Sequence, residues 1–354
     1  MKLSKQNLTR RKLIQIAGGI AALASVKGLS QTGLARSAQI SKPNRLSAGA
    51  TIGLITPASN VPENEDLLAA MDLVRSLGFE AKAAPNLRRR KQYLAGSDKQ
   101  RAEDLNGMFA DQEVDAIFCV RGGYGSGRLL RELDYQTIAS NPKILMGYSD
   151  ITAILNAIHL KTGMITYHGP MAGDNFSSYT YDQFQRVLME PRQVTLIGEP
   201  PPFVEKPGVV ERKNRLTPIV SGHAEGRLIG GNLSLLVTLL GTPYEPDFDG
   251  AILFIEDVSE PPYSVDRMLT HLWLTGHLER TAGIVFGKFT DDNYDNNTLS
   301  MEQVLHERCE PLGIPTLRGA MIGHIEDQTV VPIGANAHLD VNAGTLTLLE
   351  TAVS

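Results

Sequence analysis

Short apolar runs and amphipathic segments alternate along the first half of the chain. Apolar runs rich in β-branched residues occupy 51–55 and 114–120, and 79–83 is expected to form a further strand, whereas apolar residues recur at helical spacing in 64–77. A second helix is expected at 98–109, because Ser97 can cap it and the acidic Asp98 suits its first turn. Helical spacing predicts a helix with one buried face, and a short apolar run bounded by turn residues predicts a buried strand. Strands and helices in alternation predict a parallel sheet with helices on its faces, so an α/β N-terminal domain is expected.

A change in composition separates the two halves. Residues 198–222 contain five prolines among mixed charges, which predicts an extended interdomain linker. Beyond it, the apolar runs 251–255 and 282–287 predict buried strands. Alternating runs separated by glycines at the C-terminus predict antiparallel hairpins, at 329–333, 337–341 and 345–349. The C-terminal domain is therefore expected to be mixed and β-rich, with a barrel-like end.

The N-terminus has the tripartite pattern of an export signal. A basic head contains the pair Arg10-Arg11, and an apolar stretch of 14 residues follows from Leu13 to Val26, before a tail of small residues. The arginine pair resembles a twin-arginine signal. The apolar stretch is shorter than the roughly 20 residues of a membrane-spanning helix. We expect export, with a periplasmic location, although an uncleaved signal would act as a membrane tether.

Together these patterns predict four parts. They are an export signal at 1–38, an N-terminal α/β domain at 46–197, a linker at 198–222 and a C-terminal domain at 223–354.

Composition excludes several classes of function. The 354 residues carry a formal net charge of -5, which gives no electrostatic reason to expect nucleic-acid binding. The two cysteines, Cys119 and Cys309, have no pattern that indicates a disulfide, and Cys119 lies in an apolar run where a buried thiol is expected. The eight histidines are scattered without metal-ligand spacing, so no metal and no cofactor are predicted.

The apolar run that ends at Gly147 leads directly into a candidate nucleophile. Gly147-Tyr148-Ser149 matches the first three positions of a nucleophile elbow, although Ile151 replaces its last glycine. A serine on a tight strand-to-helix turn exposes its hydroxyl beside the amide of the next residue, here Asp150. The alternative is that Ser149 or Asp150 only caps the following helix, which is a frequent role of both residue types.

A second loop rich in glycine follows the strand at 114–120. Residues 121–128 contain four glycines, but their spacing matches neither the dinucleotide fingerprint nor a P-loop. Glycines allow backbone amides to approach a ligand closely, and the carboxyl ends of neighbouring parallel strands meet at one edge of a sheet. The amide of Gly122 or Gly123 is therefore expected to join that of Asp150 in an oxyanion hole.

A base and an acid complete the candidate chemistry. Glu256, Asp257 and Glu260 follow the buried run 251–255, and His324 lies on a loop after a glycine. A serine nucleophile needs a base, and an acid orients that base. Glu256 is preferred among the three acids because it directly ends the predicted strand, but Asp257 and Glu260 stay open. The order serine, acid, histidine occurs in other serine hydrolases and is not diagnostic by itself.

Five ordered motifs carry a resemblance to a known family. They are Arg121-Gly122-Gly123-Tyr124-Gly125, Gly147-Tyr148-Ser149-Asp150-Ile151-Thr152, Gly230-Gly231-Asn232-Leu233, Ile255-Glu256-Asp257-Val258, and Gly323-His324 followed by Val331-Pro332-Ile333-Gly334. From about Leu46 to the C-terminus, the chain resembles the LD-carboxypeptidase family of serine peptidases, a group that includes the microcin-C immunity peptidases.

The resemblance implies roles for individual residues. Ser149 would be the nucleophile, His324 the general base and Glu256 the acid that orients it, with the oxyanion held by amides of Asp150 and of the Gly122-Gly123 pair. It also implies an α/β domain and a β-rich domain with the site between them, a homodimer and no metal. The implied reaction is cleavage of an L,D-peptide bond that releases D-alanine from murein tetrapeptides.

The export signal departs from the family pattern, because well-known murein-recycling members act in the cytoplasm. This departure favours murein or another small peptide outside the inner membrane as substrate. A second hypothesis with the same chemistry is a peptidase or amidase for peptide–nucleotide conjugates. A third is a non-catalytic exported solute-binding protein, since two domains and an export signal fit that class too.

Overall fold

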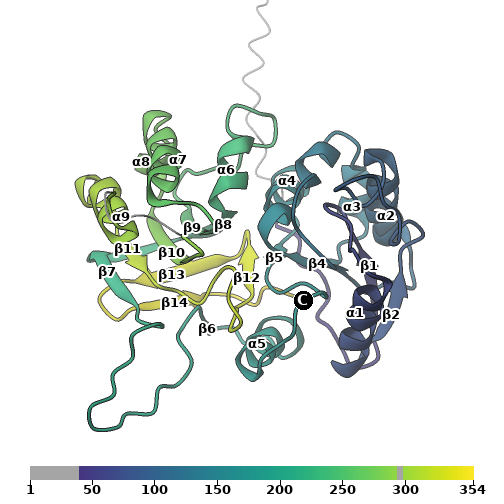
Figure 1. Ribbon diagram of the computed structural model, residues 1–354, viewed down its shortest axis with the longest axis horizontal. Coiled ribbons are helices and arrows are strands. Elements are labelled where there is room, and N and C mark those ends of the chain that lie inside the picture. The colour runs from purple at the N-terminus through teal and green to yellow at the C-terminus, as the bar shows by residue number, and fades with distance from the viewer. Residues whose placement is uncertain (1–39, 293–297) are drawn as a thin grey trace, which may run out of the picture. The chain divides into compact units, whose positions relative to one another are not determined.

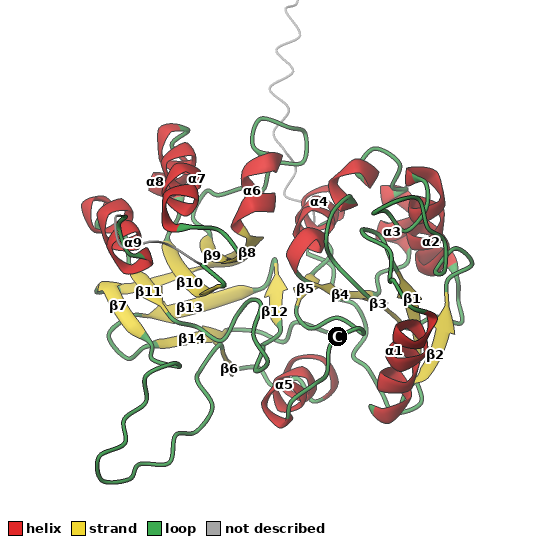
Figure 2. Cartoon of the chain, viewed as in Figure 1, coloured by secondary structure: helices red, strands yellow, loops and turns green. Residues whose placement is uncertain are grey.

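The first sheet has six strands in the order β2-β1-β3-β4-β5-β12, and all are parallel except β12. The computed structural model describes residues 40–292 and 298–354. Helices α1 and α5 cover one face of this sheet and α2, α3 and α4 the other (Figure 2). The elements of this part are β1 Thr51–Ile55, α1 Asn64–Ser76, β2 Glu80–Ala83, α2 Asp98–Ala110, β3 Ala116–Cys119, η1 Ser126–Leu129, α3 Tyr135–Ser140, β4 Ile144–Gly147, η2 Ser149–Ile151, α4 Thr152–Thr162, β5 Thr166–His168, α5 Ser178–Phe184 and the π-turn η3 Gln185–Met189.

The second sheet has eight strands in the order β6-β14-β13-β8-β9-β10-β11-β7. Strands β8 to β11 are parallel and the others antiparallel, and α6 to α9 lie on one face (Figure 1). The elements that follow η3 along the chain are β6 Thr195–Ile197, β7 Thr217–Val220, β8 His223–Asn232, α6 Leu233–Leu239, β9 Ile252–Val258, α7 Pro262–Leu274, α8 His277–Arg280, β10 Gly283–Thr290, α9 Met301–Cys309, η4 Glu310–Leu312, β11 Thr316–Arg318, β12 Val331–Ile333, β13 Asn336–Asp340 and β14 Thr345–Leu348. Of these, β12 belongs to the first sheet.

The α/β class with a parallel first sheet and a mixed second sheet is confirmed. Local sequence signals explain its helix starts: Ser97 caps α2 in a reciprocal capping box with Gln100, and Ser300 caps α9 with Gln303 in the same way. The second sheet is open rather than barrel-like, because β6 and β7 are its two edges and do not pair with each other in the described part of the chain. Cys119 and Cys309 are buried free thiols.

The segment expected to be a linker, 198–222, ends as part of the second sheet. Its residues Thr217–Val220 form edge strand β7, which pairs with β11, and β6 has already joined that sheet before the segment begins. Strand β12, from the C-terminal half of the chain, pairs with β5 of the first sheet. These exchanges make residues 40–354, as described, parts of one compact unit. The expected export signal at 1–38 lies outside the described residues, and no described helix is long and apolar enough to cross a membrane.

Alternation along β9 determines which side chains face the first sheet. Ile252 and Phe254 join the core that the two sheets share, whereas Leu253 and Ile255 pack in a second core under α6, α7 and α9. Successive strand residues point to opposite faces of a sheet. Glu256 therefore continues the row that faces the first sheet.

The end of β8 joins the two sheets. Helix α4 contacts β8, the N–H of Asn232 donates to Thr152 Oγ1 at 3.0 Å, and Asn156 Nδ2 donates to the carbonyl of Gly230 at 2.8 Å. At Gly231 φ is +130°, and an added Cβ would lie 2.6 Å from Thr152 Oγ1. This glycine permits the close approach of β8 to the helix that follows Ser149.

Gly231→Ala is expected to destabilise the protein by about 3 kcal/mol, because overpacking and a left-handed alanine act together. Thermal unfolding measures the loss. Gly78→Ala is the matched control: its φ is +90°, but no atom lies within 4 Å of the added carbon. The Gly231 variant should unfold at a clearly lower temperature than the Gly78 variant, and equal losses would contradict the role of β8 in joining the sheets.

Candidate active site

Ser149 lies on a strained turn between β4 and α4. Its φ is +60°, the left-handed region that a non-glycine residue rarely adopts. The short turn η2 starts at Ser149, and neither Tyr148 before η2 nor Ile151 before α4 makes a side-chain cap. Neither Ser149 nor Asp150 therefore caps the following helix, which was the alternative to a nucleophile at this turn. Ser149 is partly exposed.

Asp150 accepts hydrogen bonds from Ser126 and not from the first turn of α4. Its carboxylate Oδ2 accepts from the N–H of Ser126 at 2.7 Å, and its carbonyl accepts from the Ser126 hydroxyl. Burial raises the pKa of Asp150, and the hydrogen bonds from Ser126 act against this rise. These contacts join the turn that carries Ser149 to η1, which begins within the glycine-rich loop.

Gly122 lies directly against the candidate nucleophile. A Cβ at Gly122 would be 3.0 Å from Ser149 Cβ, 3.2 Å from Ser149 Oγ and 3.5 Å from the amide nitrogen of Asp150. The N–H groups of Gly122 and Gly123 donate none of the backbone hydrogen bonds between the described loops. Glycine thus leaves space beside Ser149, and the position of Gly122 suits an oxyanion donor. Gly123 is turned toward Ser59 instead, since its Cβ would lie 2.4 Å from Ser59 Oγ.

Two residues that anchor this loop, Arg101 and Ser59, have no local sequence pattern that marks them. Arg101 of α2 is 1% exposed, and its guanidinium donates to the carbonyl of Gly125 at 2.9 Å and to Asp98 at 2.6 Å. Ser59, in the loop after β1, accepts from the N–H of Tyr124 at 3.1 Å. Both contacts join residues that are distant in sequence, so helical or strand periodicity does not reveal them.

His324 and Glu256 form a buried pair. His324 Nδ1 lies 2.8 Å from Glu256 Oε2, with the histidine side chain 19% exposed and the glutamate 0% exposed. Glu256 lies inside β9, opposite Asn232 of β8, and does not end the strand as expected. At Gly323 φ is +117° and a Cβ would lie 2.8 Å from Glu256 Oε2, so glycine lets the loop place His324 against the carboxylate.

Strand alternation distinguishes Glu256 from its neighbours. Asp257 points to the other face, where Oδ1 accepts from Asn232 Nδ2 at 2.8 Å and Oδ2 accepts from the N–H of Ser234 at 2.9 Å. Glu260 lies near the Ser234 hydroxyl, at 3.4 Å. Of the three acids left open by the sequence, Glu256 is the one in hydrogen-bond contact with His324.

Burial and charge perturb both members of the pair. Burial raises the pKa of Glu256, and the hydrogen bond with His324 acts in the opposite direction. Burial alone would lower the pKa of His324, but the hydrogen bond and charge of Glu256, aided by the charges of Asp257 and Asp174, raise it above the ordinary 6.5. With Glu256 ionised, Nδ1 of His324 carries the shared proton and Nε2 is left free to act as a base.

The pair lies beside the turn that carries Ser149. The ring of Tyr148, the residue before Ser149, meets the ring of His324 edge to face with centroids 4.8 Å apart. Ser149 Oγ and His324 share no hydrogen bond in the described structure. Catalytic hydrogen bonds in unliganded enzymes are often long and tighten when substrate binds. The structure thus brings Gly122, Asp150 and Ser149 together and sets the His324–Glu256 pair against their turn.

The ring of a buried histidine, His168, packs against the ring of Tyr148. It lies at the end of β5, with ring centroids 6.0 Å from Tyr148 and 5.3 Å from Phe254. Burial, and secondarily the charge of His324, lowers the pKa of His168 to about 3. His168 therefore stays neutral near pH 7, and its ring packs between Tyr148 and Phe254.

A pocket of about 640 Å³ borders Asp150. Its wall combines the loop after β3 with α6 and the residues that follow it, including Arg128, Arg131, Leu235 and Tyr244. Arg128 is held by Asp98, to which Nε and Nη2 donate at 3.0 and 2.8 Å. The pocket offers cationic and apolar surface beside the residue that follows Ser149.

Comparisons with known proteins agree with this arrangement. Family profiles match residues 52–169 as the LD-carboxypeptidase N-terminal domain and residues 225–339 as the LD-carboxypeptidase C-terminal domain. A probable murein peptide carboxypeptidase of Bacillus subtilis is 40% identical over 88% of this chain and 95% of its own. The murein tetrapeptide carboxypeptidase of Pseudomonas aeruginosa is 31% identical over 82% of this chain and 93% of its own.

A solved structure shows the same fold. MccF in complex with glutamyl sulfamoyl guanosine has a TM-score of 0.80 at 27% identity, covering 88% of this chain and 99% of its own. The first profile spans the Ser149 turn and the glycine-rich loop, and the second spans the Glu256–His324 pair. With both halves of the site inside matched domains, in the same order along the chain, this protein belongs to the LD-carboxypeptidase family.

Proposed function

We propose that this protein is a serine carboxypeptidase that cleaves an L,D-peptide bond and releases terminal D-alanine from murein tetrapeptides. The observation that carries the proposal is the buried Glu256–His324 pair set against a strained turn that presents Ser149. The family and the murein peptide carboxypeptidases among its relatives supply the substrate class. A binding protein has no need of a base that is held by a buried acid.

Each residue has one role in the proposed mechanism. Ser149 Oγ attacks the carbonyl carbon of the L,D bond while His324 Nε2 takes the hydroxyl proton. Glu256 fixes the ring through Nδ1 and stabilises the imidazolium. The amides of Asp150 and Gly122 or Gly123 donate to the developing oxyanion.

Collapse of the tetrahedral intermediate, which carries the oxyanion, completes the first half of the reaction. The C–N bond breaks, His324 returns the proton to the leaving amine and D-alanine departs, leaving an acyl ester on Ser149. Water then attacks the ester with His324 again as base, which releases the shortened peptide and restores the serine. The chain, the peptide and one water molecule account for every proton in this sequence.

The pocket beside Asp150 is proposed to hold the non-reacting part of the peptide. Murein peptides carry free carboxylates, and Arg128 and Arg131 offer positive charge in its wall. We also propose export to the periplasm, supported by the Arg10-Arg11 pair and the apolar stretch after it, and a homodimer, supported by the family resemblance.

The test is D-alanine release from a murein tetrapeptide by the purified chain. A tetrapeptide with terminal L-alanine is the matched control, and the expected result is release from the D-terminated peptide alone. Labelling of the protein by a serine-directed phosphonate would further separate an enzyme from a solute-binding protein. Equal release from both peptides would contradict L,D specificity, and absence of both release and labelling would overturn the serine mechanism.

A second substrate class is favoured by one comparison. The related MccF structure contains glutamyl sulfamoyl guanosine, an amino acid joined to a nucleoside through a sulfamoyl group. The same Ser149 chemistry would cleave such a conjugate at its acyl linkage. Cleavage of this compound in place of the tetrapeptide would move the assignment to peptide–nucleotide conjugates.

A further inference from the structure

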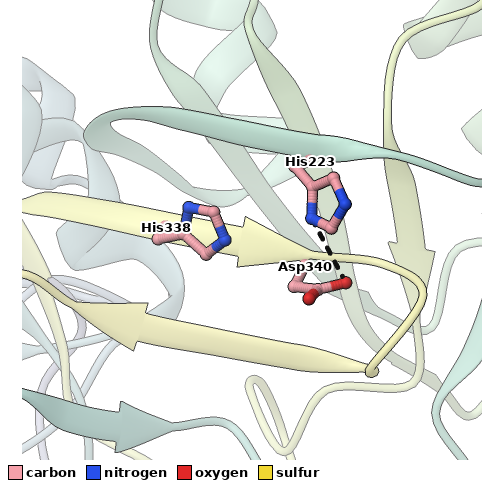
Figure 3. A group of neighbouring side chains, drawn as sticks. All are labelled: His223, His338 and Asp340. Carbon is pink, nitrogen blue, oxygen red and sulfur yellow. Dashed lines mark ion pairs between the residues drawn. The ribbon is translucent and has the colours of Figure 1, made fainter.

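Two histidines and an aspartate meet on the exposed face of β8 and β13 (Figure 3). In the antiparallel register Asp340 lies opposite His223, and His338 lies opposite Glu225. Cross-strand partners share a face, as do residues two apart on one strand, so all four side chains project from the same side. The alternate residues Ala224, Ala337 and Leu339 are buried, which identifies this side as the solvent side.

The side chains are already close to one another. His223 Nδ1 lies 3.4 Å from Asp340 Oδ1, and the rings of His223 and His338 stack with centroids 5.9 Å apart and an interplanar angle of 23°. One ligand atom from each of His223, His338 and Asp340 lies within 4.8 Å of the others. Their side chains are 57%, 32% and 25% exposed, so an ion can enter and small rotamer changes can close the site.

We propose that His223, His338 and Asp340 bind a divalent transition-metal ion of the Zn²⁺ type. Two imidazoles and one carboxylate are ligands that zinc prefers, at about 2.0–2.2 Å, and water completes a tetrahedral site. Calcium and magnesium prefer sites built from oxygen alone, which this one is not. Glu225 holds His338 Nδ1 at 3.3 Å and can orient that ring, as carboxylates do around metal-bound histidines.

The site would act as a cross-strand staple away from the catalytic pair. Strand β8 runs from His223 to the Gly230–Asn232 segment that contacts α4, and β13 follows β12, which pairs with the first sheet. An ion bound between the two strands stabilises the native state but not the unfolded chain. Metal binding is therefore expected to raise the thermal stability of the sheet that carries Glu256.

Calorimetric titration of the full, tag-free chain with ZnCl₂ tests the proposal. The expected result is binding of one Zn²⁺ per chain, with a melting temperature several degrees higher when free Zn²⁺ is about 100 times Kd. His223→Ala and His338→Ala should each weaken binding at least about tenfold. Both variants should fold as the wild type does, because the two side chains lie on an exposed face.

The matched control is His306→Ala. His306 on α9 also pairs with a carboxylate, Glu310 Oε1 at 2.7 Å, but it belongs to no group of three potential ligands in the described residues. Its replacement should leave Zn²⁺ affinity unchanged. Absence of binding to the wild type, unchanged affinity in His223→Ala and His338→Ala, or equal displacement of Zn²⁺ by Mg²⁺ would each overturn the proposal.

Discussion

Ser149→Ala is expected to abolish D-alanine release, lowering kcat by at least about 10⁴-fold, while the melting temperature stays near that of the wild type. The loss is large because Ser149 is the proposed nucleophile, placed beside Gly122 on the turn that meets His324. Rates with the tetrapeptide and a thermal melt of the same preparation measure the two quantities. Ser140→Ala, which removes an exposed hydroxyl on α3, is the matched control and should keep full activity.

The variant Ser149→Gly distinguishes the loss of the nucleophile from an effect on stability. The φ of +60° costs a non-glycine residue about 1 kcal/mol or more, and glycine adopts it freely. Ser149→Gly should therefore be as inactive as Ser149→Ala yet unfold at a slightly higher temperature. This result would show that the turn stores strain to present a nucleophile. Activity in either variant would exclude Ser149 as the nucleophile. A large loss of stability in both variants would instead assign Ser149 a structural role.

Local chemistry explains why much of the fold was predictable. The bounds of β1 and the start of α2 follow from an apolar run and from the Ser97 capping box, signals that depend on adjacent residues. The three-residue strand β6 was beyond such signals, since it is defined by its pairing with a distant partner. Strand β12 lies inside the run 329–333, which predicted a hairpin, but it pairs with β5 of the first sheet instead. The proline-rich segment shows the same limit, because its strand β7 forms only at the edge that β11 provides.

Some residues of the candidate site are likewise marked by local sequence motifs, whereas others are determined by contacts between distant segments. Ser149 and the glycines stood out because a strand-to-helix turn imposes residue types that a short motif records. Glu256 was preferred for the wrong reason, its supposed position at the strand end, whereas parity along β9 decides which acid faces His324. The anchoring by Arg101 required knowledge of which loops meet. Likewise His223 and His338, which are distant in sequence, become neighbours only through the register of β8 and β13.

Glu256→Gln is expected to lower kcat by about 10³- to 10⁴-fold and to move the pH profile. A glutamine keeps the shape of the side chain but removes the charge that holds the ring and stabilises the imidazolium. Only neutral His324 can accept the serine proton, so kcat/KM should fall as pH drops through the pKa of this histidine. The Glu256 hydrogen bond raises that pKa, which places the acidic limb of the wild type above the ordinary value of 6.5.

The sign of the change in Glu256→Gln follows directly. Loss of the anionic partner, with His324 still largely buried, lowers the pKa of the histidine, so the acidic limb of the residual activity moves to lower pH. Asp257→Asn is the matched control, since this acid bonds Asn232 and Ser234 on the other face of β9. It should retain most of the activity and shift the limb far less. A larger loss or shift in Asp257→Asn than in Glu256→Gln would transfer the orienting role to Asp257.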